Sequence, residues 1–370
     1  MYSKRFSAVV LAGLCAVMPA ACGDDDEQAT TESTVPETAT PDSSTGTTAD
    51  EAAPTGERTQ VRLSFQPDPV IQWMDQQGMF EKFEDEYNVE FIQTESFDPG
   101  PAFLGNRADI ISVGTFEIAA IEQETGLKTV TFGRTGDNYS IVAVRADDPA
   151  ETLADLEGKK VGSRGGGGGP LTLAVIAQAL HGLEYKAEGG AGGDFETVLV
   201  DDHLVNIDLL LRGDVDAIAV THPVVATWLQ SGQMKALYGG KMAYEIMTEA
   251  IGEGKDVGFG LNNLVAREDW YDTHPNEVRF MLAIYDEAAK VWKDNKAEII
   301  RAFGEDYNVE TEEDAQFIVD TYTKADPVPE TAYLDQDYID GETKILDLMG
   351  EVGILDPDAE KPRFEIVQPE

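Results

Sequence analysis

The sequence has few cysteines and histidines, and each shortage excludes a kind of site. The two cysteines are Cys15 and Cys22, and we expect Cys15 to be removed with the N-terminal segment described below. One remaining thiol excludes an internal disulfide and a cysteine-based metal site. The four histidines show no His-x-x-x-His or carboxylate–histidine spacing, so we expect neither a metal ion nor a cofactor. The fold must therefore rest on packing alone.

Basic residues are also scarce. Lysine and arginine total 27 against 70 aspartates and glutamates, which makes the formal net charge −43. This balance excludes nucleic acid as a partner, because a phosphate backbone requires clustered lysines and arginines. It does not exclude a small anion, because a few local donors can outweigh a distant acidic surface.

Sequence motifs of several enzyme classes are missing as well. No Gly-Lys-Ser/Thr of a nucleotide-binding loop follows the glycine-rich stretch, and no Gly-x-Ser-x-Gly is present. Paired carboxylates remain an open alternative, since the chain has many and the sequence distinguishes none of them. We therefore predict no catalytic residue.

The N-terminal segment, residues 1–21, has the pattern of a signal peptide. Two basic residues precede an apolar stretch at 8–17 that is too short to span a bilayer. The segment ends in Met-Pro-Ala-Ala before Cys22, which resembles a bacterial lipobox with Pro19 in place of the usual leucine. We expect lipidation at Cys22, with cleavage after an alanine in an ordinary signal peptide as the alternative. Residues 22–58 are acidic and of low complexity, which predicts a disordered tether.

Strand and helix patterns alternate through the rest of the chain, which predicts an α/β fold with mostly parallel strands. The segment 275–292 is an amphipathic helix whose inner stripe includes Tyr285 and Trp292, and we expect both to be packing residues. Residues 356–370 are expected to be an exposed tail. Strands are expected at 61–65, 89–93, 108–113, 129–132, 140–144, 197–200, 217–220 and 261–266, with a further short strand around Val161.

A local repeat connects the two halves of this pattern. Residues 104–110 parallel residues 210–217, and Asp109 then corresponds to Asp216. Each copy continues into a strand and a turn that opens a helix. Two similar α/β domains with helix N-termini at strand ends would form a cleft between them. Coincidence between two generic helix–turn–strand units is the alternative.

Five consecutive glycines, residues 165–169, lie between a strand and the helix that Pro170 opens. Their bare N–H groups at a helix N-terminus are suited to an anion or a polar ligand. A loose surface loop is the other interpretation.

Several phrases of the sequence resemble one known family. They are Gln-Gly-Met-Phe-Glu-Lys at 77–82, Asp-Leu-Glu-Gly-Lys-Lys-Val-Gly at 155–162, Val-Ala-Arg-Glu at 265–268 and His-Pro-Asn-Glu-Val-Arg-Phe at 274–280. With the lipobox and the tether, they resemble the solute-binding proteins of bacterial ABC importers. The branch is the one that takes nitrate, sulfonates, taurine and thiamine-type pyrimidine precursors. The resemblance covers residues 60–355.

This resemblance implies a type II periplasmic-binding fold with two lobes and a hinge. Lobe 1 would comprise residues 59–144 and 257–370, and lobe 2 residues 145–256. The protein would be a monomer without enzymatic activity, anchored by lipid to the outer face of the cytoplasmic membrane. Its partners would be a small-molecule ligand and the permease subunits.

Ligand contacts in such proteins come from turns at strand ends. Arg134 and Arg164 would be counter-charges for an anion, and His222 would donate if protonated. The predicted ligand-binding residues are Gln66, Pro67, Asp98, Gly114, Thr115, Phe116, Arg134, Ser163, Gly165, Gly166, Gly167, Gly168, Thr221 and His222.

Three functions stay open at this point. The first is capture of a small organic anion such as a sulfonate, taurine or a nitrate-like ion. The second is capture of a heterocyclic vitamin precursor of the pyrimidine or flavin type, and the third is an enzyme on the same fold. For the second, the residues that could stack on a ring are Trp73, Phe97, Phe116, Phe132, Tyr139 and Phe259.

Overall fold

The computed structural model describes residues 57–96, 98–165, 168–190 and 192–369. The expected signal peptide, Cys22 and most of the expected tether lie outside the described residues. So do Phe97, Gly166 and Gly167. No helix within the described ranges is long and apolar enough to cross a membrane.

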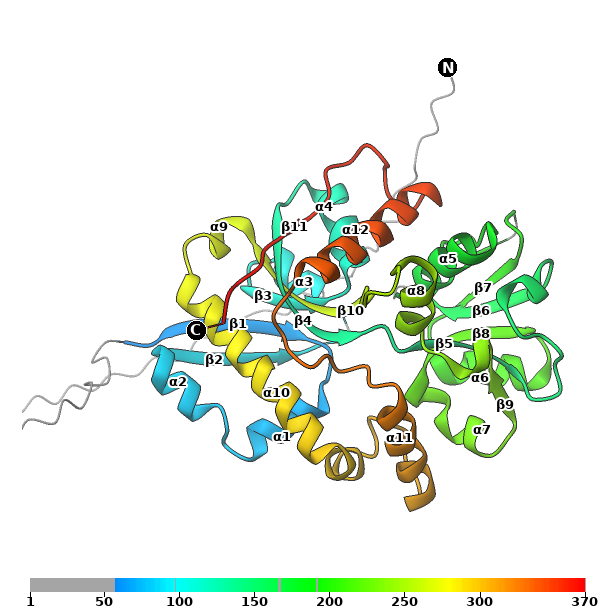
Figure 1. The fold of residues 1–370 in the computed structure, drawn as a ribbon, viewed down its shortest axis with the longest axis horizontal. Coiled ribbons are helices and arrows are strands. Elements are labelled where there is room, and N and C mark those ends of the chain that lie inside the picture. The colour runs from blue at the N-terminus through cyan, green and yellow to red at the C-terminus, as the bar shows by residue number, and fades with distance from the viewer. Residues whose placement is uncertain (1–56, 97, 166–167, 191, 370) are drawn as a thin grey trace, which may run out of the picture. The chain divides into compact units, whose positions relative to one another are not determined.

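The first sheet has six strands in the order β11-β4-β10-β3-β1-β2 (Figure 1). β1 pairs in parallel with β2 and β3, and β10 runs antiparallel to β3 and β4. All four residues of β3 are buried, as expected for a parallel strand covered on both faces. The strands are β1 (Thr59–Phe65), β2 (Val89–Glu95), β3 (Ile110–Val113), β4 (Thr129–Asp137), β10 (Gly260–Arg267) and β11 (Arg363–Phe364).

The helices that follow strands of the first sheet include a long one, α10, which contacts both α1 and α2 (Figure 1). Pro275 opens α10, where its missing N–H is not needed. These helices are α1 (Pro69–Gln76), α2 (Glu81–Tyr87), α3 (Gly100–Leu104), α4 (Thr115–Thr125), α9 (Glu268–Tyr271), α10 (Pro275–Ala302), α11 (Glu312–Lys324) and α12 (Gln336–Glu351).

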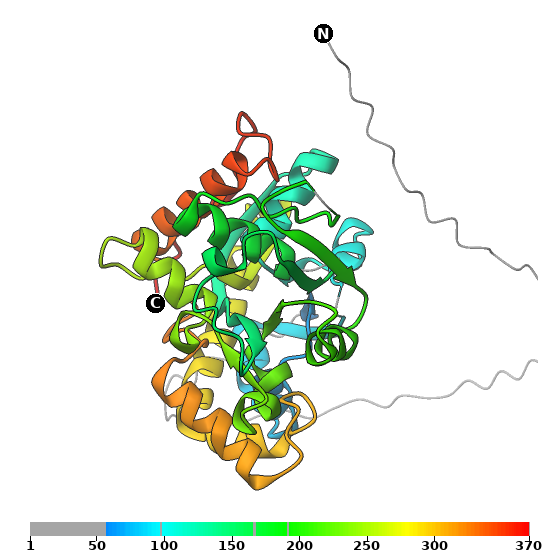
Figure 2. The same cartoon turned by 90° about the vertical axis from the view of Figure 1, so that its right-hand side faces the viewer.

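The second sheet has five strands in the order β7-β6-β8-β5-β9. β6 pairs in parallel with β7 and β8, and β5 runs antiparallel to β8 and β9. Figure 2 shows α11 beside α7, and the two helices are in contact. The elements are β5 (Ser140–Arg145), β6 (Lys160–Arg164), β7 (Glu196–Val200), β8 (Ala217–Thr221), β9 (Met234–Ala236), α5 (Gly168–His181), α6 (His203–Arg212), α7 (Ala226–Gln230) and α8 (Ala243–Ile251).

The local repeat read from the sequence is a structural repeat. The N–H of Asp109 donates to the carbonyl of Arg62 (2.8 Å), and the N–H of Arg62 donates to the Asp109 carboxylate (3.0 Å). Asp216 makes the same two contacts with Lys160, at 2.8 and 3.0 Å. Each aspartate thus ties the start of β3 or β8 to β1 or β6. The order β2-β1-β3 in one sheet matches β7-β6-β8 in the other, so coincidence is no longer needed to explain the pattern.

Two boundaries expected from the sequence differ from the structure. β5 pairs with β8 and β9, so it belongs to the second sheet, although the expected lobe boundary at 144/145 placed it in lobe 1. Nothing in the local sequence of β4 or β5 says which sheet either strand joins. The expected exposed tail contains β11, which pairs in parallel with β4. Arg363 of β11 also forms ion pairs with Glu268 and Asp272 at 3.2 and 3.1 Å.

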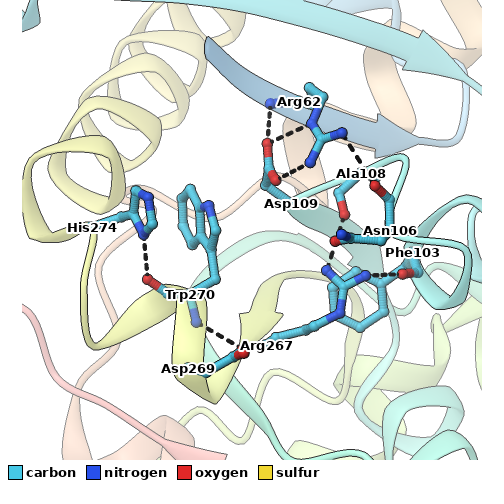
Figure 3. Close-up of polar contacts among 9 residues, drawn as sticks. All are labelled: Arg62, Phe103, Asn106, Ala108, Asp109, Arg267, Asp269, Trp270 and His274. Carbon is cyan, nitrogen blue, oxygen red and sulfur yellow. Dashed lines mark hydrogen bonds and ion pairs between the residues drawn. The ribbon is translucent and has the colours of Figure 1, made fainter. Parts of the chain in front are cut away.

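The family-like phrases at 265–280 hold the first sheet to its neighbours (Figure 3). Arg267 donates to the carbonyl oxygens of Ala108, at 3.3 Å, and of Phe103, and its guanidinium lies over the Phe103 ring. The Trp270 and His274 rings stack with centroids 4.5 Å apart. These residues therefore join the end of β10 to the α3–β3 segment and to the start of α10.

Helix α12 approaches the segment before β10 very closely at Gly341. A Cβ atom added there would lie 2.6 Å from Val257 Cβ and 2.7 Å from its Cα. Gly350, in the same helix, has its nearest such contact at 3.3 Å, to Pro357. Of these two positions, Gly341 is therefore the one where a side chain would collide with a neighbouring backbone.

We expect Gly341→Ala to lower the free energy of unfolding by about 1–3 kcal/mol, because overpacking against a backbone forces the helix away. Gly350→Ala is the matched control and should stay within about 1 kcal/mol of the wild type, since alanine also favours the helix. Urea denaturation of both variants measures the difference. Equal stabilities of the two variants would contradict this account of Gly341.

Candidate ligand-binding cavity

A cavity of about 650 Å³ is lined by residues from both sheets. The carboxyl ends of the parallel strands β1, β3, β6 and β8 contribute Phe65, Ser112, Ser163 and Thr221. Ligands of open α/β sheets bind outside the carboxyl ends of strands. The rest of the wall includes the β4–β5 connection, the β7–α6 connection, the start of β10, α10, α11 and the segment that joins these two helices.

One part of the lining, which we call the serine cluster, consists of Ser163, Arg164, Gly168 and Gly169. Ser163 is fully buried, and its hydroxyl has no hydrogen-bond partner among the described residues. A Cβ atom at Gly169 would lie 2.7 Å from that hydroxyl oxygen. The absence of a side chain there lets the start of α5 lie against Ser163.

Arg164 brings a positive charge to the serine cluster. Its Nε donates to the carbonyl of Asp201 at 3.4 Å, and it forms no ion pair in the part of the chain that the structure describes. A helix N-terminus, an unpartnered hydroxyl and a guanidinium together favour a negatively charged group.

A second part of the lining, the tyrosine cluster, consists of Tyr139, Tyr285, Tyr307 and Tyr322. They come from the β4–β5 connection, α10, the α10–α11 segment and α11. Burial raises the pKa of Tyr139 to about 12, and it raises the pKa of the other three well above the usual value. Trp292 lies beside the cluster, with its ring centroid 6.2 Å from that of Tyr322.

Asp68 lines the cavity next to these tyrosines. Its Oδ1 accepts from the N–H groups of Val70 (2.9 Å) and Ile71 (3.4 Å), which caps helix α1. Burial raises the pKa of Asp68 to about 6, and the charges of Glu95 and Asp306 raise it further. The charge of Asp68 in turn contributes to the raised pKa values of the nearby tyrosines.

The structure brings some of the predicted site residues together and leaves others apart. Gln66, Pro67, Ser163, Gly168 and Thr221 line the cavity. Gly166 and Gly167 lie outside the described residues. Those that do not line the cavity are Asp98, Gly114, Thr115, Phe116, Arg134, Gly165 and His222.

Arg134 lines a different cavity, of about 600 Å³. Its guanidinium lies 3.5 Å from the carboxylate of Asp256 and over the ring of Tyr338. It also faces Asp137, whose pKa burial raises to about 8. Arg134 therefore balances the protein's own carboxylates, and this placement does not support its predicted role as a counter-charge for the solute.

His222 also differs from the prediction. It is buried at the start of the turn after β8 and lies against the rings of Phe317 and Tyr322. Burial lowers its pKa to about 4, so the ring is neutral near pH 7. It cannot be the protonated donor that we expected.

The turn into α4 is used for packing. The Phe116 ring lies against two glycines: a Cβ atom would lie 2.8 Å from it at Gly114 and 2.6 Å from it at Gly168. Thr115 is buried and accepts a hydrogen bond from Asn263 at 2.9 Å. These residues shape the region next to the serine cluster without lining the cavity.

Sequence reasoning missed most of the tyrosine cluster. Tyr285 and Trp292 lie on the core stripe of α10, as expected, and they are 4% and 2% exposed. The same stripe nevertheless forms the cavity wall, and helical spacing cannot separate a core position from a cavity position. Asp68 follows two predicted residues directly, and its place before the Pro69–Gln76 helix was the available signal.

No group of three or more histidine, cysteine, aspartate or glutamate side chains within the described ranges is arranged to hold a metal ion. The residues that line the cavity offer hydrogen bonding, charge and contact with aromatic rings to a small molecule.

Comparison with solved structures shows the fold. The chain is similar to the aliphatic sulphonate binding protein SsuA from Escherichia coli (19% identity, 82% of this chain and 95% of that chain, TM-score 0.61). It is also similar to the alkanesulfonate-binding protein SsuA from Xanthomonas axonopodis pv. citri bound to MOPS (15%, 81% and 96%, 0.60). A Candida albicans protein with the generic periplasmic binding protein fold is a third match (13%, 84% and 98%, 0.55). The predicted type II periplasmic-binding fold is confirmed.

Comparison of the sequence with family models gives a second finding. Residues 69–248 match the family model of the phosphonate periplasmic substrate-binding protein of ABC transporters. No curated protein matches the chain. The predicted resemblance to ABC-importer solute-binding proteins is confirmed by this family match together with the shared fold.

The raised pKa of Asp68 has a measurable consequence for stability. Because its pKa is about 6 in the folded chain and 3.8 ordinarily, the folded state holds the proton more tightly. The contribution of this carboxyl to stability therefore falls as the pH rises from about 4 to about 6.

The asparagine side chain of an Asp68→Asn variant would stay neutral and still cap α1. We expect the free energy of unfolding of Asp68→Asn, relative to the wild type, to increase by about 1–3 kcal/mol between about pH 4 and about pH 7. Urea denaturation across this range measures it. Parallel pH profiles of the two proteins would show that burial does not raise the pKa of Asp68.

Proposed function

We propose that this protein captures a small organic solute with an oxyanion head group, of the sulfonate or phosphonate kind, and delivers it to the permease of an ABC importer. The observation that carries the proposal is the serine cluster. It offers a buried hydroxyl without a partner among the described residues, the start of α5 and the guanidinium of Arg164 at one wall of the cavity. Hydrogen bonds to a charged group are stronger than those between neutral groups.

The comparisons support the same class of ligand. Two similar structures are sulfonate-binding proteins by name, and the matching family model is that of phosphonate-binding proteins. A sulfonate and a phosphonate both present three oxygens around a tetrahedral centre, which a serine hydroxyl and backbone N–H groups can meet. Taurine and nitrate-like ions belong to the same proposal.

A heterocyclic precursor is the second candidate, because aromatic rings line the cavity. Of the residues expected to stack on a ring, Tyr139 is a lining residue, whereas Trp73, Phe116, Phe132 and Phe259 are not. Tyr285, Trp292, Tyr307 and Tyr322 supply the other rings. An aminopyrimidine would therefore find ring contacts here, although at other residues than those expected.

The mechanism we propose is a population shift. A solute that contacts both sheets favours a closed form of a two-lobed protein, and this form docks on the permease. We further propose that the protein acts as a monomer without catalytic activity. Lipid on Cys22 would hold it at the outer face of the cytoplasmic membrane.

The test is calorimetric titration with ethanesulfonate, methylphosphonate, nitrate and an aminopyrimidine. We expect binding of ethanesulfonate or methylphosphonate, and we expect Ser163→Ala to weaken it about tenfold, because one hydrogen bond to a charged group is lost. Ser64→Ala is the matched control, since Ser64 is also buried on a strand with a hydroxyl that has no partner in the described ranges, but it does not line the cavity. Unchanged affinity in Ser163→Ala, or binding of the aminopyrimidine alone, would refute the oxyanion proposal.

A further inference from the structure

The cavity has a strongly negative lining outside the serine cluster. Among the described lining residues, Arg164 is the one arginine, no lysine contributes, and the histidine is His203, whose pKa burial lowers. A solute with only a negative charge would therefore meet a negative field on most sides. The lining carboxylates, six in number, are Asp68, Glu117, Asp201, Asp202, Glu305 and Asp306.

Among these acidic residues, Asp68 is the one whose charge acts on three tyrosines of the cluster, Tyr139, Tyr285 and Tyr307. Oδ1 caps α1, and Oδ2 receives no hydrogen bond from a described residue. No lysine, arginine or histidine in the described ranges forms an ion pair with it. A partly desolvated carboxylate without a cation is unfavourable, and a cation beside it would offset that desolvation.

The four tyrosine hydroxyls show the same lack of partners. Tyr285, Tyr307 and Tyr322 are 4%, 8% and 2% exposed, yet their hydroxyls form no hydrogen bond within the described part of the chain. The buried Tyr338 and the half-buried Tyr238, elsewhere in this protein, do form them. The hydroxyl of Tyr338 donates to Asn263 at 2.6 Å, and that of Tyr238 accepts from Leu153 at 3.0 Å.

Asp68 and the tyrosine hydroxyls together define the ligand group that would satisfy them. Carboxylate and hydroxyl oxygens are acceptors, and an ammonium group offers three N–H donors. Aromatic ring faces also attract a cation. A trimethylammonium group offers charge but no donor, so it would leave the acceptors unpaired.

We infer that Asp68 and the tyrosine cluster form a subsite for a protonated amine with N–H donors, and that the solute is a zwitterion. Its ammonium group binds at Asp68, and its oxyanion binds at the serine cluster. This inference rests on the proposed function, and it adds a positively charged ammonium group to the solute proposed there.

The test compares matched pairs of ligands by calorimetry with the full-length protein. Taurine is compared with ethanesulfonate and with N-trimethyltaurine, and 2-aminoethylphosphonate with ethylphosphonate. We expect an amine to bind at least about tenfold more tightly than its amine-free or trimethylated analogue.

Variants localise this preference. Asp68→Asn, which keeps the cap on α1, is expected to abolish the preference for the amine over its amine-free analogue. Tyr285→Phe and Tyr307→Phe should each reduce the preference several-fold. Asp335→Asn is the matched control, because Asp335 caps α12 in the same way and does not line the cavity.

A pH series gives an independent readout. The amine preference should decline as the pH falls below about 6, where Asp68 takes up a proton. The other groups that face Asp68 are Glu95, Asp306, Tyr139, Tyr285 and Tyr307. The tyrosines stay neutral in this range, so Asp68→Asn should remove the pH dependence of the preference.

The outcomes separate the two proposals. Equal affinity for taurine and ethanesulfonate, or an amine preference that survives Asp68→Asn, would overturn the amine subsite and leave the oxyanion proposal standing. Binding of amines that lack an oxyanion, such as putrescine, with no binding of any sulfonate or phosphonate, would overturn the oxyanion proposal and the zwitterionic solute, and would leave the amine subsite standing. No binding of any of these ligands would overturn both.

Discussion

The architecture depends on one interaction that occurs twice. In each copy, an aspartate forms two hydrogen bonds with the backbone of the neighbouring parallel strand, one through its own N–H and one through its carboxylate. Asp109 fixes the start of β3 against β1, and Asp216 fixes the start of β8 against β6, with near-identical distances. Because these pairs start in register, their carboxyl ends reach the same edge of each sheet. Ser112, Ser163 and Thr221 line the cavity for that reason. The hydrogen bonds at the start of these strands thus determine which residues line the cavity at their carboxyl ends.

The site that we propose is divided between a donor-rich wall and an acceptor-rich wall. Ser163, Arg164 and the start of α5 supply hydrogen-bond donors, whereas Asp68 and the tyrosine hydroxyls are mostly acceptors. The large negative net charge does not decide the ligand by itself, because screening limits distant charges and local donors dominate. Asp68 has a second role as the cap of α1, so the same carboxylate links the start of a helix to the chemistry of the cavity.

The sequence predicted the elements well and the site in part. Alternating patterns placed nearly all strands, and the Asp109 and Asp216 repeat predicted two equivalent units. Sheet membership was harder, since the local sequence of β5 contains no information about the strands with which it pairs. Strand-end reasoning found Gln66, Ser163 and Thr221, because topology alone brings strand ends together. It could not place Arg134 or Tyr285, whose directions are decided by long-range packing, nor foresee that burial keeps His222 neutral.

The C-terminal residues have a consequence for solubility. Strand β4 would otherwise be the outermost strand of its sheet, with backbone groups open to pairing with another chain. The N–H of Glu365 donates to Thr131, and residues of the 327–333 segment accept from Arg134 and Asp137, so this border is covered along its length. The C-terminal residues and the 327–333 segment together therefore shield a nine-residue strand from intermolecular β-pairing and aggregation.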